Sequence, residues 1–175
     1  RQAQGDLAGA IFDYTRAIEL DPNLAMAYVN RGVARQAQGD LAGAIFDYTR
    51  AIELDPNLAM AYYNRGIARK AQGDLAGATL DYTRAIELDP NFAKAYSNRG
   101  DAQQDQGDLA GAVEDYDRAR EIDPKLWQAW ANRGIALAGL GRREEALASF
   151  ERALTLCPPE RRAQVETARR QFLGE

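Results

Sequence analysis

The chain has 175 residues, 46% hydrophobic and 27% charged, which is enough material for one domain-sized array of secondary structure. Its formal net charge of −4 argues against nucleic acid as the main partner, because proteins that bind nucleic acid usually present a basic stripe. The sequence has no histidine, the commonest general base, and Cys157 is its single cysteine, so an internal disulfide is excluded. No apolar run has the length of a membrane span, so we expect no membrane partner.

A period of 34 residues runs through the chain. Gly32 recurs as Gly66, Gly100 and Gly134, and residues 1–28 match residues 35–62 letter for letter. A fixed period in this range is typical of solenoid proteins, whose units stack to complete one core. We predict a single array over 1–175, with a partial repeat over 1–23, full repeats over 24–57, 58–91, 92–125 and 126–158, and a capping helix over 159–175.

Each full repeat predicts two antiparallel helices. In the first full repeat, residues 24–38 form a weakly amphipathic first helix. Residues 41–54 form the second helix and place apolar side chains on one face at helical spacing. Gly39 suits the left-handed residue that closes the first helix, and Asp40 suits the N-cap of the second. Pro56 ends the second helix, and Asn57 is the expected N-cap of the next. The predicted helices span roughly 6–20, 24–38, 41–54, 58–72, 75–88, 92–106, 109–122, 126–140 and 143–156.

The two ends of the array differ. The last segment is rich in Arg and Glu, which keeps the outer face of a terminal repeat hydrated, and Ala163, Val165, Ala168 and Phe172 form a thin apolar stripe. The N-terminal end has no comparable cap, because residues 1–4 continue a pattern identical to residues 35–38. We therefore expect further repeats upstream and self-association through the exposed face around Leu7, Ile11 and Tyr14.

The repeated positions resemble the tetratricopeptide repeat. In the first full repeat the match runs through six positions that recur in every later one: Tyr28, Gly32, Ala44, Tyr48, Ala51 and Pro56. The resemblance implies an all-α fold, a right-handed superhelical α-solenoid of antiparallel helix pairs, in which the first helices line a concave groove. The sequence departs from the pattern where Arg replaces Leu (Arg31, Arg65, Arg99 and Arg133) and where Arg or Gln replaces Tyr (Arg35, Arg69 and Gln103).

A row of asparagines occupies one groove-facing position of the resembling array. The four copies are Asn30, Asn64, Asn98 and Asn132. An amide side chain offers donors and an acceptor that match an exposed peptide unit, so the row favours binding of an extended peptide backbone. The alternative is that asparagine only tolerates a wet helix face or forms local hydrogen bonds.

The flanking positions would set side-chain specificity. The first two full repeats offer an apolar strip of Met26, Val29, Val33, Met60, Tyr63 and Ile67, which suits varied apolar ligands unless these residues pack against adjacent first helices. The third full repeat instead carries Lys94 and Asp101, and it has 8 acidic and 5 basic residues between Phe92 and Lys125. That repeat favours a basic or hydroxyl-bearing ligand segment, although a solvated charged face explains the composition equally well.

One known ligand class of the family is disfavoured. Chaperone-adaptor repeats clamp acidic C-terminal tails with Lys, Asn and Arg, and placing Asn64 at the centre of such a clamp leaves only Lys94 matching. Val29, Val33 and Asn98 stand where the clamp requires other residues. Two carboxylates need more than one cation, so we do not predict this clamp.

Arginine and aspartate recur together at fixed positions. We predict that Arg31, Arg65, Arg99 and Arg133 pair between helices with the aspartates that precede each Tyr, namely Asp13, Asp47, Asp81 and Asp115, in a structural role.

No motif in the sequence indicates catalysis, a cofactor or a metal. We predict a non-catalytic scaffold that holds an extended peptide or partner helix in its concave groove, with a protein or peptide as partner and no nucleic acid. The alternative is an architectural, self-associating segment of a larger protein.

Overall fold

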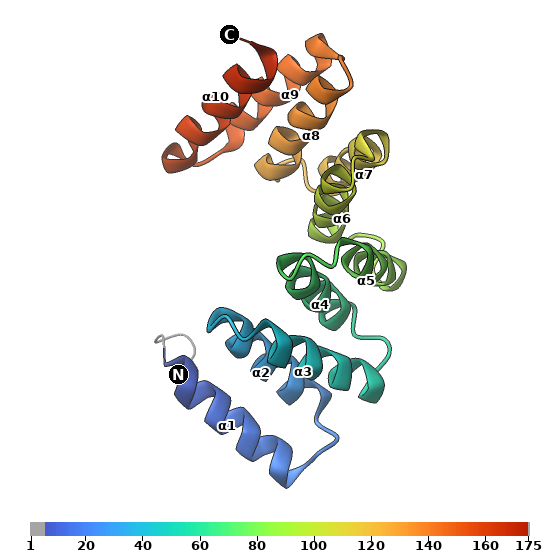
Figure 1. Cartoon of the computed structure of the whole chain (residues 1–175), viewed down its shortest axis with the longest axis vertical. Helices are drawn as coiled ribbons and strands as arrows, with labels where there is room; N and C mark the ends of the chain where they lie inside the picture. The colour runs from blue at the N-terminus through green and yellow to red at the C-terminus, as the bar shows by residue number, and fades with distance from the viewer. Residues whose placement is uncertain (1–5, 175) are drawn as a thin grey trace. The chain divides into compact units, whose positions relative to one another are not determined.

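The structure, a computed structural model, describes residues 6–174, and these residues form helices without strands. The helices group into two compact units, which we describe separately (Figure 1). The unit of residues 1–90 contains α1 (Leu7–Leu20), α2 (Ala25–Ala37), α3 (Leu41–Leu54), α4 (Ala59–Ala71) and α5 (Leu75–Leu88). The unit of residues 91–175 contains α6 (Ala93–Asp105), α7 (Leu109–Ile122), α8 (Trp127–Gly139), α9 (Arg143–Leu156) and α10 (Pro159–Leu173).

The turns inside the hairpins follow the predicted chemistry. Gly39 has φ +86°, a conformation that favours glycine, and Asp40 accepts a hydrogen bond from the Gly43 backbone N at 2.9 Å. The prediction for Asn57 is wrong, because the N-cap of α4 is Leu58, without a side-chain cap. The Asn57 backbone N instead donates to Asp55 Oδ1 at 3.0 Å, so the aspartate organises the turn between hairpins.

A glycine and a tyrosine allow the helices of a hairpin in the first unit to approach closely. A Cβ on Gly32 would lie 2.7 Å from Tyr48 Cε1, and the Tyr48 side chain is fully buried with Ala44 and Ala51. Gly66 meets Tyr82 in the same way. Because α3 packs on both α2 and α4, consecutive hairpins of this unit share one core.

The second unit uses the same packing and ends on α10. Phe150 replaces the tyrosine and lies against Gly134. Helix α10 packs on both α8 and α9 and buries Val165 and Leu173, whereas Ala163 and Phe172 are exposed, so the predicted stripe is only partly correct. At the end of α10, Leu173 is buried in place of Phe172.

The predicted fold class, an all-α solenoid of antiparallel helix pairs, is confirmed. One continuous array over 1–175, its right-handed superhelix and the repeat boundaries stay predictions. The segment 1–4, whose sequence repeats that of 35–38, lies outside the described residues. Among the described helices, none combines the length and the apolar character needed to traverse a bilayer.

Candidate functional site

Three residues line one face of each hairpin's first helix at spacings of i, i+4 and i+7, which places them in a row along the helix. We call each row a first-helix stripe. The stripes are Met26, Asn30 and Val33 on α2; Met60, Asn64 and Ile67 on α4; Lys94, Asn98 and Asp101 on α6; and Gln128, Asn132 and Ile135 on α8.

The two stripes of the first unit lie on helices that contact each other directly, α2 and α4. Met26 and Met60 are 54% and 51% exposed, so both thioethers are accessible to a ligand. Asn30 and Asn64 are partly buried, as are Val33 and Ile67. This unit therefore presents two asparagine amides between flexible thioethers and aliphatic side chains.

Two predicted site residues of the first unit have packing roles. Val29 is only 3% exposed and belongs to the hydrophobic core, so it has little surface to offer a ligand. Tyr63 is partly buried, and its ring centroid lies 6.1 Å from that of Tyr82 at an interplanar angle of 51°. We therefore leave Val29 out of the candidate site and keep Tyr63 at its edge.

In the second unit, Asp101 is the centre of a hydrogen-bonded group. Its Oδ1 accepts from Tyr116 Oη and from Asn132 Nδ2, each at 2.7 Å. Burial and the nearby Asp101 carboxylate raise the pKa of Tyr116 well above its ordinary value, so this phenol stays protonated and donates. The Asn132 amide thus forms the kind of local hydrogen bond that competes with a peptide-binding role. Asn98 is partly buried and Lys94 is exposed.

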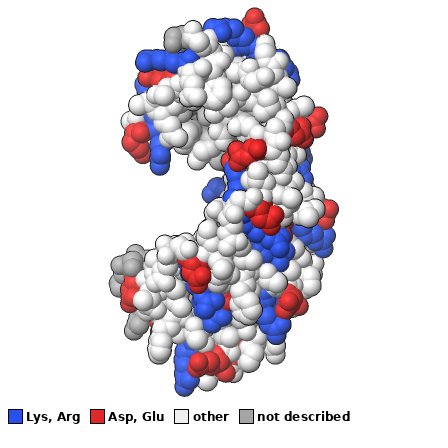
Figure 2. Space-filling model, viewed as in Figure 1, with Lys and Arg blue, Asp and Glu red and all other residues white. Residues whose placement is uncertain are grey.

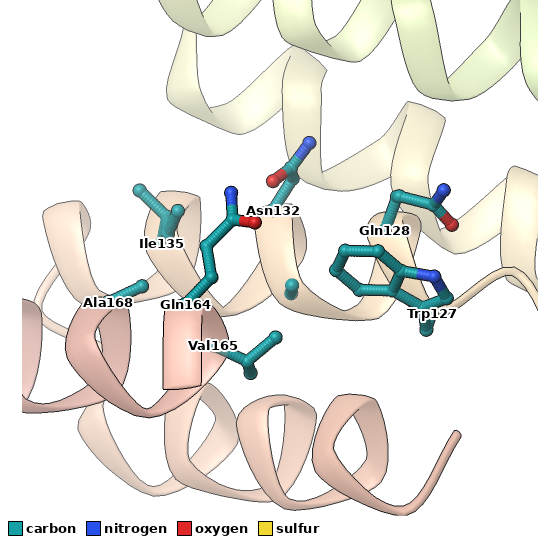
Figure 3. Close-up of a pocket in the computed structure, with 8 residues that line it drawn as sticks. Trp127, Gln128, Asn132, Ile135, Gln164, Val165 and Ala168 are labelled. Carbon is teal, nitrogen blue, oxygen red and sulfur yellow. The ribbon is translucent and has the colours of Figure 1, made fainter. Parts of the chain in front are cut away.

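A cavity of about 220 Å³ lies beside Asn132, between α8 and α10 (Figure 3). Trp127 and Ile135 line it from α8, and Val165 and Ala168 line it from α10. Gln128, Asn132 and Gln164 add amide groups. The sequence analysis missed this cavity, although Trp127 was a usable signal because it replaces the alanine found at positions 25, 59 and 93.

The predicted arginine–aspartate pairs are confirmed in three hairpins. Arg31 donates from Nε and from an Nη to Asp47 at 2.9 and 2.7 Å, and Arg65 binds Asp81 with the same distances. Arg99 binds Asp115 with 2.7 Å at both contacts. These pairs are buried or partly buried between two helices of one hairpin, so their role is structural.

The pairing predicted for Arg133 is wrong, because Ser149 occupies the position at which the other hairpins have aspartate. Arg133 donates from Nη1 to Ser149 Oγ at 2.7 Å and from Nε to Asp117 Oδ1 at 2.7 Å. Asp117 belongs to α7, in the preceding hairpin. The pairing predicted for Asp13 stays a prediction.

Two further contacts complete the arginine–aspartate clusters. Arg35 Nη1 and Arg69 Nη1 each donate to the same aspartate as their neighbouring arginine, at 2.9 Å. Arg31 Nη1 also donates to Thr15 Oγ1 of α1, and Arg65 Nη1 donates to Thr49 Oγ1 of α3, each at 3.1 Å and each on the helix before the arginine's own hairpin. The repeat pattern has Leu and Tyr at the positions of these arginines. Arginine replaces them because both guanidinium groups of a hairpin bind one buried carboxylate.

The face drawn in Figure 2 shows no large patch of a single charge sign among the described residues. On the face drawn in Figure 2, basic and acidic side chains are interspersed in both units. No group of three or more metal-ligating side chains is found within residues 6–174, and Cys157 is buried.

Comparison with protein-family sequence models agrees with the helix pairs. Models described as TPR repeat match residues 2–39, 35–73 and 68–107, and models described as tetratricopeptide repeat match residues 93–126 and 127–159. All of these are repeat models rather than models of a catalytic family. A comparison with curated protein sequences finds no match.

Solved structures show the same architecture. The chain is similar to a crystal structure of MamA, with 30% identity and a TM-score of 0.84 over 93% of this chain and 94% of that one. For residues 41 to the end of MamA from Desulfovibrio magneticus RS-1, 20% identity and a TM-score of 0.82 over 89% of this chain and 88% of that one show the fold alone. The first TPR of Spaghetti (RPAP3), bound to the HSP90 peptide SRMEEVD, is 29% identical with a TM-score of 0.66, over 67% of this chain and 93% of that one.

Proposed function

Since this chain belongs to the tetratricopeptide repeat family, we propose that it is a non-catalytic protein-interaction scaffold whose first-helix stripes bind an extended peptide or a partner helix. The observation that carries the proposal is the partly buried pair Asn30 and Asn64, flanked by the half-exposed Met26 and Met60. Amides suit a peptide backbone, and methionines adapt to varied apolar side chains.

The acidic peptide seen on the RPAP3 repeat is a poor model for this ligand. Two carboxylates at the end of a tail need cations that are free to bind them. Lys94 is the one cation on the stripes, and the arginines of the first helices near them, Arg31 and Arg65, are held by Asp47 and Asp81. We therefore expect the ligand to differ from an acidic C-terminal tail.

Alanine substitution of the asparagines tests the proposal. Immobilised chain is used to capture partners, which mass spectrometry identifies, and the same partners are then tested with Asn30→Ala combined with Asn64→Ala. We expect a large loss of capture and an unchanged helical melt. The matched control is Asn57→Ala, because Asn57 is an exposed asparagine in the turn before α4 and is not a member of a stripe. Unchanged capture by the double variant would reject a role for the stripes.

A second candidate function is self-association through α1. Tyr14 is only partly buried, whereas its repeat equivalents Tyr48, Tyr82 and Tyr116 are fully buried. Leu7 and Ile11 on the same helix are partly buried as well, and this face could pack against a second copy. Light scattering over a hundredfold range of concentration tests this candidate, because a constant monomer mass would exclude it.

A further inference from the structure

We propose that the second unit selects ligand segments that carry a basic side chain one or two residues from an apolar one. Asp101 would bind the cation, and the cavity between α8 and α10 would hold the apolar group. This inference rests on the function proposed above and names the chemistry of its ligand.

Asp101 places a negative charge where the other stripes are aliphatic. Its equivalents are Val33, Ile67 and Ile135, and none of these carries a polar group. The Asp101 side chain is partly buried and accepts hydrogen bonds from Tyr116 and Asn132, which are both neutral. Two neutral donors fix the position of the carboxylate but leave its charge uncompensated.

The contrast with Asp115 shows what is missing at Asp101. The Arg99 guanidinium binds both carboxylate oxygens of Asp115. Asp101 forms no ion pair with any residue between 6 and 174. Lys94 is on the same stripe but seven residues away, or about 10 Å along the helix axis. A partly buried carboxylate is more stable with a cation beside it, so a Lys or Arg of a ligand fits this position.

The cavity supplies the second half of the site. Its volume of about 220 Å³ is below the roughly 300–1,000 Å³ of small-molecule sites, so it suits a single side chain. The indole of Trp127 and the side chains of Ile135 and Val165 provide apolar walls. In Figure 3, the amides of Gln128 and Gln164 lie around these walls, where they can meet a peptide backbone.

Asn132 joins the two parts and sets the spacing of the ligand groups. Its amide nitrogen bonds to Asp101, and its side chain also lines the cavity. Asn132 therefore lies between the carboxylate and the cavity and contacts both. An extended peptide advances about 3.3 Å per residue, so neighbouring or next-neighbouring ligand residues can occupy both sites.

Fluorescein-labelled octapeptide pools provide the probe. Each pool fixes Leu at one position and Lys, Gln or Glu at the adjacent or next position, and the remaining positions are random. Fluorescence anisotropy with the full chain measures an apparent Kd for each pool. We expect the Lys pool to bind about tenfold more tightly than the Glu pool, with the Gln pool between them, and the preference for Lys to shrink as salt is added.

Two variants assign the preference to its residues. Asp101→Asn keeps an acceptor for Tyr116 and Asn132 but removes the charge, so it should reduce binding of the Lys pool to that of the Gln pool. Ala168→Leu fills the cavity and should weaken all three pools about equally. Glu114→Gln is the matched control, because Glu114 is an exposed carboxylate on α7, away from the stripes.

The outcomes separate this inference from the proposed function. Equal binding of the three wild-type pools, or an unchanged Lys preference in Asp101→Asn, would overturn the inference. The proposed function would survive that result if Asn30→Ala with Asn64→Ala still weakened every pool. If no pool bound to the wild-type chain, the inference would be rejected, and the capture experiment would still decide the proposed function. The wild-type salt dependence decides the matter even if a variant fails to fold.

Discussion

Arg133 Nε donates to Asp117 Oδ1 at 2.7 Å, and this bond ties α8 to α7 of the preceding hairpin. In the other hairpins the repeat equivalents of Asp117 are Thr15, Thr49 and Thr83, and the main carboxylate is within the same hairpin as the arginine. The fourth hairpin has Ser149 in place of that aspartate. The arginine of the fourth hairpin therefore pairs with an aspartate of the preceding hairpin, whereas the other arginines pair with an aspartate of their own hairpin.

This exchange predicts a rescue. Asp117→Thr should destabilise the chain by about 1–3 kcal/mol, because the partly buried Arg133 loses the carboxylate that accepts its Nε–H hydrogen bond. Adding Ser149→Asp restores the arrangement of the other hairpins and should recover most of the loss. Urea unfolding followed by circular dichroism measures both effects. Additive losses in the double variant would show that the two positions do not share the arginine.

The cluster around Asp81 should be a major source of stability in the first unit. Arg65 and Arg69 both bind this buried carboxylate, so Asp81→Ala leaves Arg65 without a carboxylate and Arg69 with only the more distant Asp74, and it should cost about 3–5 kcal/mol. The comparison variant is Glu87→Ala, which removes the exposed Arg84–Glu87 pair and should cost less than about 1 kcal/mol. Similar melting temperatures for the two variants would contradict the prediction.

Gly66→Ala should destabilise the first unit by about 1–3 kcal/mol through overpacking. The new methyl group would lie 2.7 Å from Cε1 of Tyr82, which is buried and cannot move away freely. Gly139→Ala is a suitable control because its nearest neighbour is the flexible end of Leu109. Thermal melts of the two variants provide the comparison. Equal melting temperatures would contradict the predicted clash.

Stability should fall above about pH 10, the ordinary pKa of tyrosine. Burial raises the pKa of Tyr48, with a smaller contribution from Asp47, and burial with Asp101 raises that of Tyr116. A folded-state pKa above the unfolded one gives stability that is fully present below the unfolded pKa and is lost as pH rises toward the folded pKa. Melting temperatures between pH 8 and 11 measure this loss.

Tyr116→Phe is the matched test for the alkaline effect, because Phe150 already occupies the equivalent position in the fourth hairpin. The variant has no proton to lose at that position, so its melting temperature should fall less between pH 8 and 11. Tyrosinate absorbance should show that the buried phenols ionise only on unfolding. Ionisation of all the tyrosines near pH 10 in the folded chain would contradict the assignment.

The sequence predicted best what the repeat itself encodes. Helices α3, α5, α7 and α9 have the predicted bounds, because each begins after a glycine-containing turn and ends before a Pro or Cys-Pro turn. Asn57 was misassigned because it can cap a helix as well as complete a turn, and only the backbone path distinguishes the two. The burial of Val29 likewise depends on how α2 packs beside α4.

The features that the sequence did not predict lie where residues depart from the repeat pattern. Helix α10 lacks the repeated pattern, so its packing on α8 and the cavity beside Trp127 depend on contacts that periodicity does not specify. The partner of Arg133 changed because two substitutions in different hairpins compensate for each other. Within the candidate site, the residue types were predictable, but the bond between Asn132 and Asp101 was not.

The bonds from Arg31 to Thr15 and from Arg65 to Thr49 have a consequence for how the first unit comes apart. Each arginine has its full set of acceptors only while the hairpin before it is in place. Detachment of one hairpin therefore leaves a guanidinium N–H without an acceptor in the next and loosens the two helices that it joins. Local opening in this unit should propagate from each hairpin to its successor.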